Sequence, residues 1–119
     1  MAGKILCFYQ LNCHKTDVAN RHLNEGMLNS KEGFLSVGLS QEPGHTKGKI
    51  THFDNSFNIF QGCNINPRAC IVISKNMNTI MLNQFADQDT VAIQINDGNR
   101  TLVIASVYMP YDSIQPPPP

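Results

Sequence analysis

The sequence contains no tryptophan and carries no formal net charge, and only 15% of its 119 residues are charged. Without a basic excess, the chain is not expected to bind nucleic acid through overall charge, because such proteins are usually visibly basic. Any such role must depend on a local site. Apolar residues make up 41% of the chain, which argues against disorder over most of its length. The length fits one small domain.

Long apolar runs are also missing, and none approaches the roughly 18 residues of a membrane-spanning helix. We therefore expect no membrane partner. The N-terminal stretch MAGKILCFYQLN has no small-residue cleavage site and is not interpreted as a signal peptide. No C-x-x-C pair occurs among the four cysteines, which disfavours a zinc-thiolate site. We expect reduced thiols in an intracellular protein, with Cys7 and Cys70 as small core residues.

The pattern of apolar residues predicts an α+β chain with one helix and a mostly antiparallel sheet. The helix is expected within 15–29, capped by Thr16 or Asp17, with its apolar face at Val18, Ala19, His22, Leu23 and Met27. On that face, His22 is expected to pack at the edge of the core. Strands are expected at 4–12, 34–40, 68–75, 78–82, 90–95 and 101–109.

Two features of the predicted strands concern their packing. Small residues on one face of the 34–40 strand, Ser36 and Gly38, indicate close approach by another layer. The Asp-Gly pair at 97–98 predicts a tight hairpin. The 101–109 strand is apolar on both faces and needs covering on both sides. We expect residues 43–67, rich in Gly, Asn, Pro and Ser, to form a long irregular segment.

Polar residues follow three of the predicted strands. Asn12 ends the first, Glu42 follows the second in the run LSQEPG, and Tyr108 ends the last. If these strands are neighbours, the three side chains gather at one edge of the sheet. A carboxylate beside an amide suits Mg²⁺, which prefers oxygen ligands and keeps several waters. The residues leave open an ordinary alternative, in which Glu42 is simply a turn residue before Pro43 and Gly44.

These motifs resemble the first half of an endonuclease/exonuclease/phosphatase domain of the DNase I-like fold. The segments in question are QLN, LSQEP, RACIVISK and DTVAIQI with LVIASVYMPYDS. They are most similar to the endonuclease domains of non-LTR retrotransposon polyproteins, which also carry a reverse transcriptase. The resemblance implies a layered α/β sandwich, present here as its N-terminal half. Residues 1–115 would form this partial domain, and 116–119 a proline-rich end.

The resemblance also implies roles for particular residues. Glu42 corresponds to the family's metal-binding glutamate and Asn12 to an asparagine near the metal and phosphate, with Mg²⁺ or Mn²⁺ as the cofactor. Tyr108 corresponds to a tyrosine that faces the scissile phosphate. Arg68 corresponds to a basic residue and is carried over as a DNA contact. No role is assigned to His14, Lys15 or Asp112.

The family's remaining catalytic groups, an Asp-x-Asn pair and a late Ser-Asp-His run, have no counterpart in these 119 residues. We therefore expect a fragment of a DNA-nicking endonuclease that is inactive alone, with the missing half and DNA as partners, self-association through the exposed sheet, and nuclear localisation by family implication. Two alternatives stay open. One is a phosphatase or deadenylase of the same fold, and the other is a non-catalytic remnant that acts only by binding.

Overall fold

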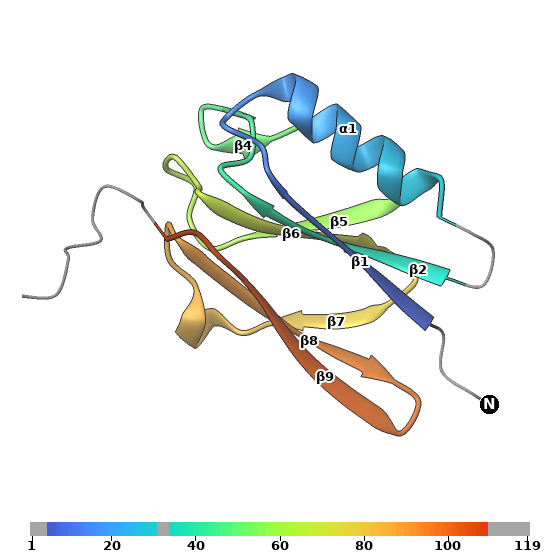
Figure 1. The fold of residues 1–119 in the computed structure, drawn as a ribbon. Coiled ribbons are helices and arrows are strands. Elements are labelled where there is room, and N and C mark those ends of the chain that lie inside the picture. Colours follow the sequence, from blue (N-terminus) through green and yellow to red (C-terminus); the bar gives the residue numbers. More distant parts are fainter. Residues whose placement is uncertain (1–4, 31–33, 110–119) are drawn as a thin grey trace, which may run out of the picture.

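The computed structural model describes residues 5–30 and 34–109, in which strands dominate and one α-helix is present (Figure 1). The helix α1 (Asp17–Leu28) lies between the first two strands, and a 3-10 turn, η1 (Asn83–Phe85), precedes β8. The strands are β1 (Ile5–Asn12), β2 (Phe34–Gln41), β3 (His45–Thr46), β4 (Lys49–Ile50), β5 (Phe57–Gln61), β6 (Ala69–Ser74), β7 (Asn78–Met81), β8 (Thr90–Asp97) and β9 (Arg100–Val107).

A four-stranded sheet with the order β1-β2-β6-β5 forms the centre of the molecule. β1 and β2 are parallel, and Asn12 pairs with Gln41 at their ends. A parallel pair requires a crossover connection, which α1 provides. β6 runs antiparallel to both β2 and β5. Because parallel strands end at the same edge, the residues that follow β1 and β2 lie together.

A three-stranded antiparallel sheet, β7-β8-β9, lies on the side of the four-stranded sheet opposite α1 (Figure 1). The β8–β9 hairpin closes at the pair Asp97 and Arg100, as the Asp-Gly signal predicts. Gly98 has a φ of +62° there, a conformation that glycine adopts without steric cost.

Alternating side chains of β6 fill two apolar clusters, one on each face of the four-stranded sheet. On the face toward the three-stranded sheet, the cluster contains Val37, Ala69, Ile71, Ile73, Val91, Ile93 and Ile95. On the face toward α1, it contains Leu23, Met27, Ile50, Phe57, Cys70 and Val72. Each fully buried isoleucine contributes about 1.5–3 kcal/mol of burial free energy, so β6 anchors both sides of the molecule.

The small residues of β2 let α1 approach closely, as expected. A Cβ added to Gly38 would lie 2.7 Å from Met27 Sδ, and the buried Ser36 hydroxyl donates to the Met27 carbonyl at 2.8 Å. Thr16 caps the helix, because its hydroxyl oxygen accepts a hydrogen bond from the Ala19 N–H at 3.2 Å. One of the two predicted capping residues is therefore confirmed.

The predicted apolar face of α1 is partly wrong. Val18 is 61% exposed and His22 is also exposed, whereas Asn20, Leu23 and Met27 are buried. The buried face is therefore rotated toward position 20. Its polar residue is compatible with burial because it is fully hydrogen-bonded, so hydrophobicity alone could not identify the helix phase.

The segment 43–67 is more regular than expected. It contains the short β3–β4 hairpin and β5, which pairs with β6. The surrounding polar residues obscured the strand Phe57–Gln61 in the sequence. β9 ends at Val107 rather than Met109, and most of it is exposed: Leu102, Val103 and Val107 are 41%, 54% and 47% accessible.

Candidate functional site

Contacts between segments that are distant in the sequence connect the four predicted site residues at one end of the two sheets. Asn12 pairs with Gln41, the residue before Glu42. The Glu42 N–H donates to the Arg68 carbonyl at 2.8 Å, and the Arg68 guanidinium carbon lies 5.2 Å from the centroid of the Tyr108 ring. From the sequence, Asn12, Glu42 and Tyr108 were expected to lie together on the condition that their strands are neighbours in one sheet. Here β1 and β2 pair directly, while Tyr108 arrives from the other sheet.

Glu42 is held in a left-handed backbone conformation, with a φ of +48°. Such a conformation is uncommon for residues other than glycine and costs roughly 1–2 kcal/mol. It is fixed from both sides, because the Glu42 carbonyl also accepts a hydrogen bond from the Lys15 N–H at 2.7 Å. The half-buried carboxylate makes no hydrogen bond or ion pair with the residues that the structure describes. It is therefore available to a ligand.

Asn12 is exposed, and its side chain shapes the turn that follows β1. Its Oδ1 accepts a hydrogen bond from the His14 N–H at 2.9 Å. His14 and Lys15 both have positive φ, 49° and 60°, so the chain reverses sharply before α1. An amide oxygen has two lone pairs, and one of those of Asn12 Oδ1 is left for a further partner.

Asn20 anchors the turn after Glu42 and was missed by the sequence analysis. Its fully buried side chain donates to the carbonyls of Gly44 and Thr51, at 2.9 and 3.1 Å, and accepts from the Gly44 N–H at 3.0 Å. Gly44 packs against the start of the helix, where an added Cβ would lie 2.7 Å from the Thr16 carbonyl oxygen. The available signal was the spacing of Asn20 with Leu23 and Met27 on one helix face.

Arg68 connects the two sheets near Tyr108. Its Nε donates to Asp89 Oδ1 at 2.5 Å, and its Nη2 donates to Gln88 Oε1 at 3.2 Å. The Tyr108 N–H in turn donates to the Asp89 carbonyl at 2.8 Å. Asp89 was not recognised as a site residue from the sequence, because no local pattern relates it to a residue 21 positions away.

A second polar bridge joins β2 to β9 beneath this site. Gln41 Nε2 donates to Ser106 Oγ at 3.0 Å, and that hydroxyl donates to the Ser40 carbonyl at 3.0 Å. Both serines are buried. A buried bridge of this kind is well defined, because leaving one of its groups unpaired costs about 1–3 kcal/mol. It fixes the spacing between the ends of β2 and β9.

Two thiols flank Ser40 in the same region. Cys13 Sγ lies 3.2 Å from Ser40 Oγ, and Cys70 pairs with Ser40 across the sheet. Burial raises the pKa of the Cys70 thiol to about 12, and it also raises the pKa of Cys13. Both thiols are therefore neutral near pH 7 and are poor metal ligands, since a metal is bound by the thiolate. The expectation that Cys70 is a core residue is confirmed, while Cys7 is only half-buried.

The donors at this end suit a weakly held oxygen-seeking cation. They are the Glu42 carboxylate, which has no partner among the described residues, and the partly used amide oxygen of Asn12. Mg²⁺ commonly takes one or two carboxylates and completes its shell with waters and substrate phosphate. Among residues 5–30 and 34–109, no cluster of three or more His, Cys, Asp or Glu side chains is placed to enclose a metal. The arrangement fits an open site of this kind and does not fit a closed structural site.

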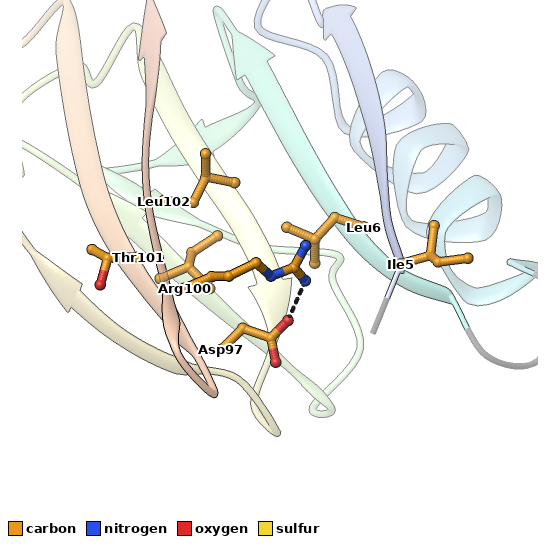
Figure 2. Close-up of a pocket in the computed structure, with 7 residues that line it drawn as sticks. Ile5, Leu6, Asp97, Arg100, Thr101 and Leu102 are labelled. Atoms are coloured by element: carbon orange, nitrogen blue, oxygen red, sulfur yellow. Dashed lines mark hydrogen bonds and ion pairs between the residues drawn. The ribbon is translucent and has the colours of Figure 1, made fainter. Parts of the chain in front are cut away.

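A cavity in the described part of the chain lies away from these residues. It has a volume of about 570 Å³ and lies between the start of β1 and the β8–β9 hairpin (Figure 2). Ile5, Leu6, Ile95 and Leu102 line it, together with the ion pair that Arg100 Nη2 forms with Asp97 Oδ2 at 2.8 Å. None of the predicted site residues contributes to this cavity.

A solved structure of similar fold was found by comparison with known proteins. This chain is similar to the endonuclease domain of TRAS1, a telomere-specific non-LTR retrotransposon, with a TM-score of 0.73 and 19% sequence identity. The match covers 90% of this chain and 47% of that chain, so this chain spans about half the length of its neighbour. No protein-family model and no curated protein matches. The likeness shows the fold, that of a mixed α/β chain with a DNase I-like endonuclease as its neighbour.

No helix in the described ranges has the length and apolarity that crossing a membrane requires.

Proposed function

We propose that this chain is part of a metal-dependent phosphodiesterase, a DNA-nicking endonuclease of the non-LTR retrotransposon type. One observation carries the proposal: Asn12, Glu42, Arg68 and Tyr108 are linked at one end of a fold similar to the TRAS1 endonuclease domain. The unpaired Glu42 carboxylate, in a backbone conformation that is costly for glutamate, supports a binding role. Strained residues of this kind are concentrated at functional sites.

In this proposal, Glu42 and Asn12 hold Mg²⁺ or Mn²⁺, and Tyr108 faces the scissile phosphate. When bound, the cation would polarise the phosphodiester and stabilise charge on its oxygens. The turn at Pro43 and Gly44 directs the chain away from Glu42 toward α1, to which Asn20 ties it. The carboxylate thereby stays accessible while its backbone remains fixed.

We further propose that the site and the layered sandwich are completed by residues outside these 119. The exposed side chains of β9 support this, because a strand with apolar residues on both faces is normally covered on both sides. The remaining catalytic groups would come from that second half, so the chain alone would not cleave DNA. The products of the complete enzyme would be nicked strands, formed in the nucleus on chromosomal DNA.

A non-catalytic binding role is the second candidate, favoured by the exposed apolar surface of β9. In that case, Glu42 is a turn residue and a divalent cation has no effect on DNA binding. Metal dependence therefore separates the two candidates.

The proposal is tested by measuring the binding of a fluorescein-labelled DNA duplex by anisotropy, in EDTA and in Mg²⁺. We expect Mg²⁺ to tighten binding several-fold, and Glu42→Gln to remove this gain. Glu25→Gln is the matched control, because Glu25 is an exposed glutamate on α1. Equal affinities with and without Mg²⁺ would exclude the phosphodiesterase assignment.

Inactivity of the isolated chain is tested separately with supercoiled plasmid, with protein in excess and Mg²⁺ or Mn²⁺ present. We expect no nicking above the level of the EDTA control. Nicking that Glu42→Gln abolishes would support the nuclease assignment and contradict the need for a second half.

A further inference from the structure

Arg68 is held by neighbours that occupy part of its guanidinium. Its Nε donates to Asp89 and its Nη2 to Gln88. The side chains of Arg68 and Asp89 are 27% and 31% exposed, so their ion pair is only partly open to solvent. A carboxylate this close neutralises much of the charge that the arginine would otherwise present to a phosphate.

The same two residues fix Tyr108 from two directions. The guanidinium of Arg68 lies over the Tyr108 ring, with 5.2 Å between its carbon and the ring centroid. The Asp89 carbonyl accepts a hydrogen bond from the Tyr108 N–H at 2.8 Å. A planar guanidinium can stack on an aromatic face and form a directed hydrogen bond to a carboxylate at the same time, which an ammonium group cannot reproduce.

Arg68 also contacts Glu42 through its backbone. Its carbonyl accepts the Glu42 N–H at 2.8 Å, and its own N–H donates to the Gln88 carbonyl at 2.8 Å. One residue thus holds the backbone of the proposed metal ligand and the ring of the proposed phosphate-facing tyrosine. The position of the Tyr108 ring relative to Glu42 therefore involves the orientation of the Arg68 side chain, which Asp89 and Gln88 both contact.

We propose that Arg68 and Asp89 form a positioning pair that sets the ring of Tyr108 relative to Glu42. Arg68 then acts through Tyr108 rather than as an independent phosphate-binding charge. The catalytic consequence of this positioning rests on the proposed function, whereas the effect on the Tyr108 ring does not. Asp89 becomes a residue as important to the site as Arg68 itself.

The two roles of Arg68 predict opposite effects of Asp89→Asn. If Arg68 binds a phosphate directly, removing its competing carboxylate leaves more charge for DNA and binding tightens. If Arg68 positions Tyr108, Asp89→Asn instead makes the Tyr108 ring more mobile and weakens DNA binding, as a substitution of Arg68 does. Loss of one direct phosphate contact also lowers the salt dependence of binding by about one unit of log–log slope.

The first experiment measures the mobility of Tyr108 directly. With Tyr9→Phe and Tyr111→Phe, Tyr108 is the one tyrosine of the three that remains, in a chain without tryptophan. We expect Arg68→Lys and Asp89→Asn each to increase acrylamide quenching of Tyr108 at least two-fold and to lower its anisotropy. Asp97→Asn is the matched control, because it breaks the Asp97–Arg100 pair at the far cavity (Figure 2) and should leave Tyr108 unchanged.

Unchanged Tyr108 fluorescence in Asp89→Asn would overturn the inference, whatever the protein's function. The second experiment repeats the Mg²⁺-dependent DNA binding on the same variants over a range of salt concentrations. We expect Arg68→Lys and Asp89→Asn to reduce the Mg²⁺-dependent gain in DNA affinity to the same extent. The slope of log affinity against log salt concentration should stay unchanged in both. Tighter binding by Asp89→Asn, with a salt slope reduced by about one in Arg68→Ala, would show direct phosphate contact and overturn the positioning role.

Failure of the proposed function gives a different result. In that case the unsubstituted chain shows no Mg²⁺-dependent gain, while Arg68→Lys and Asp89→Asn still loosen Tyr108. The positioning pair would then stand as a property of the fold, without the phosphodiesterase assignment.

Discussion

Glu42 combines a costly backbone conformation with a carboxylate that has no partner among the described residues. A carboxylate without such a partner contributes little to folding, so its removal should not lower the free energy of unfolding. This is the relation expected where function, rather than packing, determines the residue.

We therefore predict that Glu42→Asn leaves the free energy of unfolding unchanged or raises it by up to about 1 kcal/mol, because asparagine tolerates the left-handed region better. Divalent cation binding should be lost at the same time. Urea unfolding and cation titration of the same sample check both parts. A loss of stability would mean that the Glu42 side chain is structural.

The buried thiols predict a pH dependence of stability. The pKa of Cys70 is about 12 in the folded chain against an ordinary value of 9.0, and that of Cys13 is also raised. Their contribution is fully present below about pH 9 and is lost as the pH rises above it, toward about 12 for Cys70, because the unfolded chain releases these protons first. We expect the free energy of unfolding to fall by up to about 1.4 kcal/mol per pH unit for each such thiol.

Urea unfolding at pH 8, 9 and 10 measures this decline, and Cys70→Ala is the comparison that isolates it. The decline should be smaller in Cys70→Ala than in the unsubstituted chain. Identical slopes would show that other titrating groups cause the effect.

At the residue scale, the sequence indicated Asn12, Glu42 and Tyr108 as candidate site residues, because polar residues at the ends of apolar runs are visible without a structure. It did not locate Asn20 or Asp89. Asn20 depends on the phase of a helix whose buried face includes a polar residue, and Asp89 depends on a contact between two sheets. The helical spacing of Asn20 with Leu23 and Met27 was a local signal for the first, whereas no local pattern reports the second.

At the scale of elements, Asn20 is the connection between α1 and the turn that carries Glu42. Removing its amide leaves the buried Gly44 N–H and carbonyl without their partner, which costs about 1–3 kcal/mol for each unpaired group. The helix would also lose its register against the turn, and the turn that follows Glu42 would lose its anchor.

We predict that Asn20→Ala lowers the free energy of unfolding by about 2–4 kcal/mol and weakens cation binding. The matched control is Asn24→Ala, one turn further along α1, where Oδ1 accepts a hydrogen bond from the exposed Asp54 N–H at 2.8 Å. That change should cost under about 1 kcal/mol. Comparable losses in the two variants, measured by urea denaturation, would contradict the anchoring role.

Most elements were predictable for identifiable reasons. Continuous apolar runs located β1, β2 and β6, and the Asp-Gly pair located the β8–β9 hairpin. β5 was missed because five residues between polar loops give a weak signal, and its pairing with β6 is what stabilises it. The position of β9 relative to β2 follows from the packing of two sheets, and the spacing of apolar residues along the sequence does not predict how two sheets pack.

At the scale of the whole molecule, β9 is an edge strand with little to prevent further pairing. It lies at one edge of the three-stranded sheet, and its stretch from Thr101 to Val107 contains neither charge nor proline. Exposed edges of this composition are prone to pair with another chain. We propose that the isolated chain self-associates there.

We predict that the weight-average mass in sedimentation equilibrium rises with concentration, and that Val103→Lys suppresses this rise. Val103 is 54% exposed on β9, and Ile65→Lys is the control, at a loop residue that is 77% exposed. Both substitutions add one charge, so only a difference between them supports strand pairing. Equal suppression by both would indicate a general effect of charge.

The most direct test of the account is luminescence of Tb³⁺, a hard cation used in place of Mg²⁺, excited through tyrosine. The chain lacks tryptophan, and Tyr108 lies over Arg68, whose carbonyl holds Glu42. We expect saturable, tyrosine-sensitised emission that Mg²⁺ displaces, that Glu42→Gln abolishes and that Glu25→Gln preserves. Emission of equal strength in Glu42→Gln would place the cation elsewhere and contradict the proposed site.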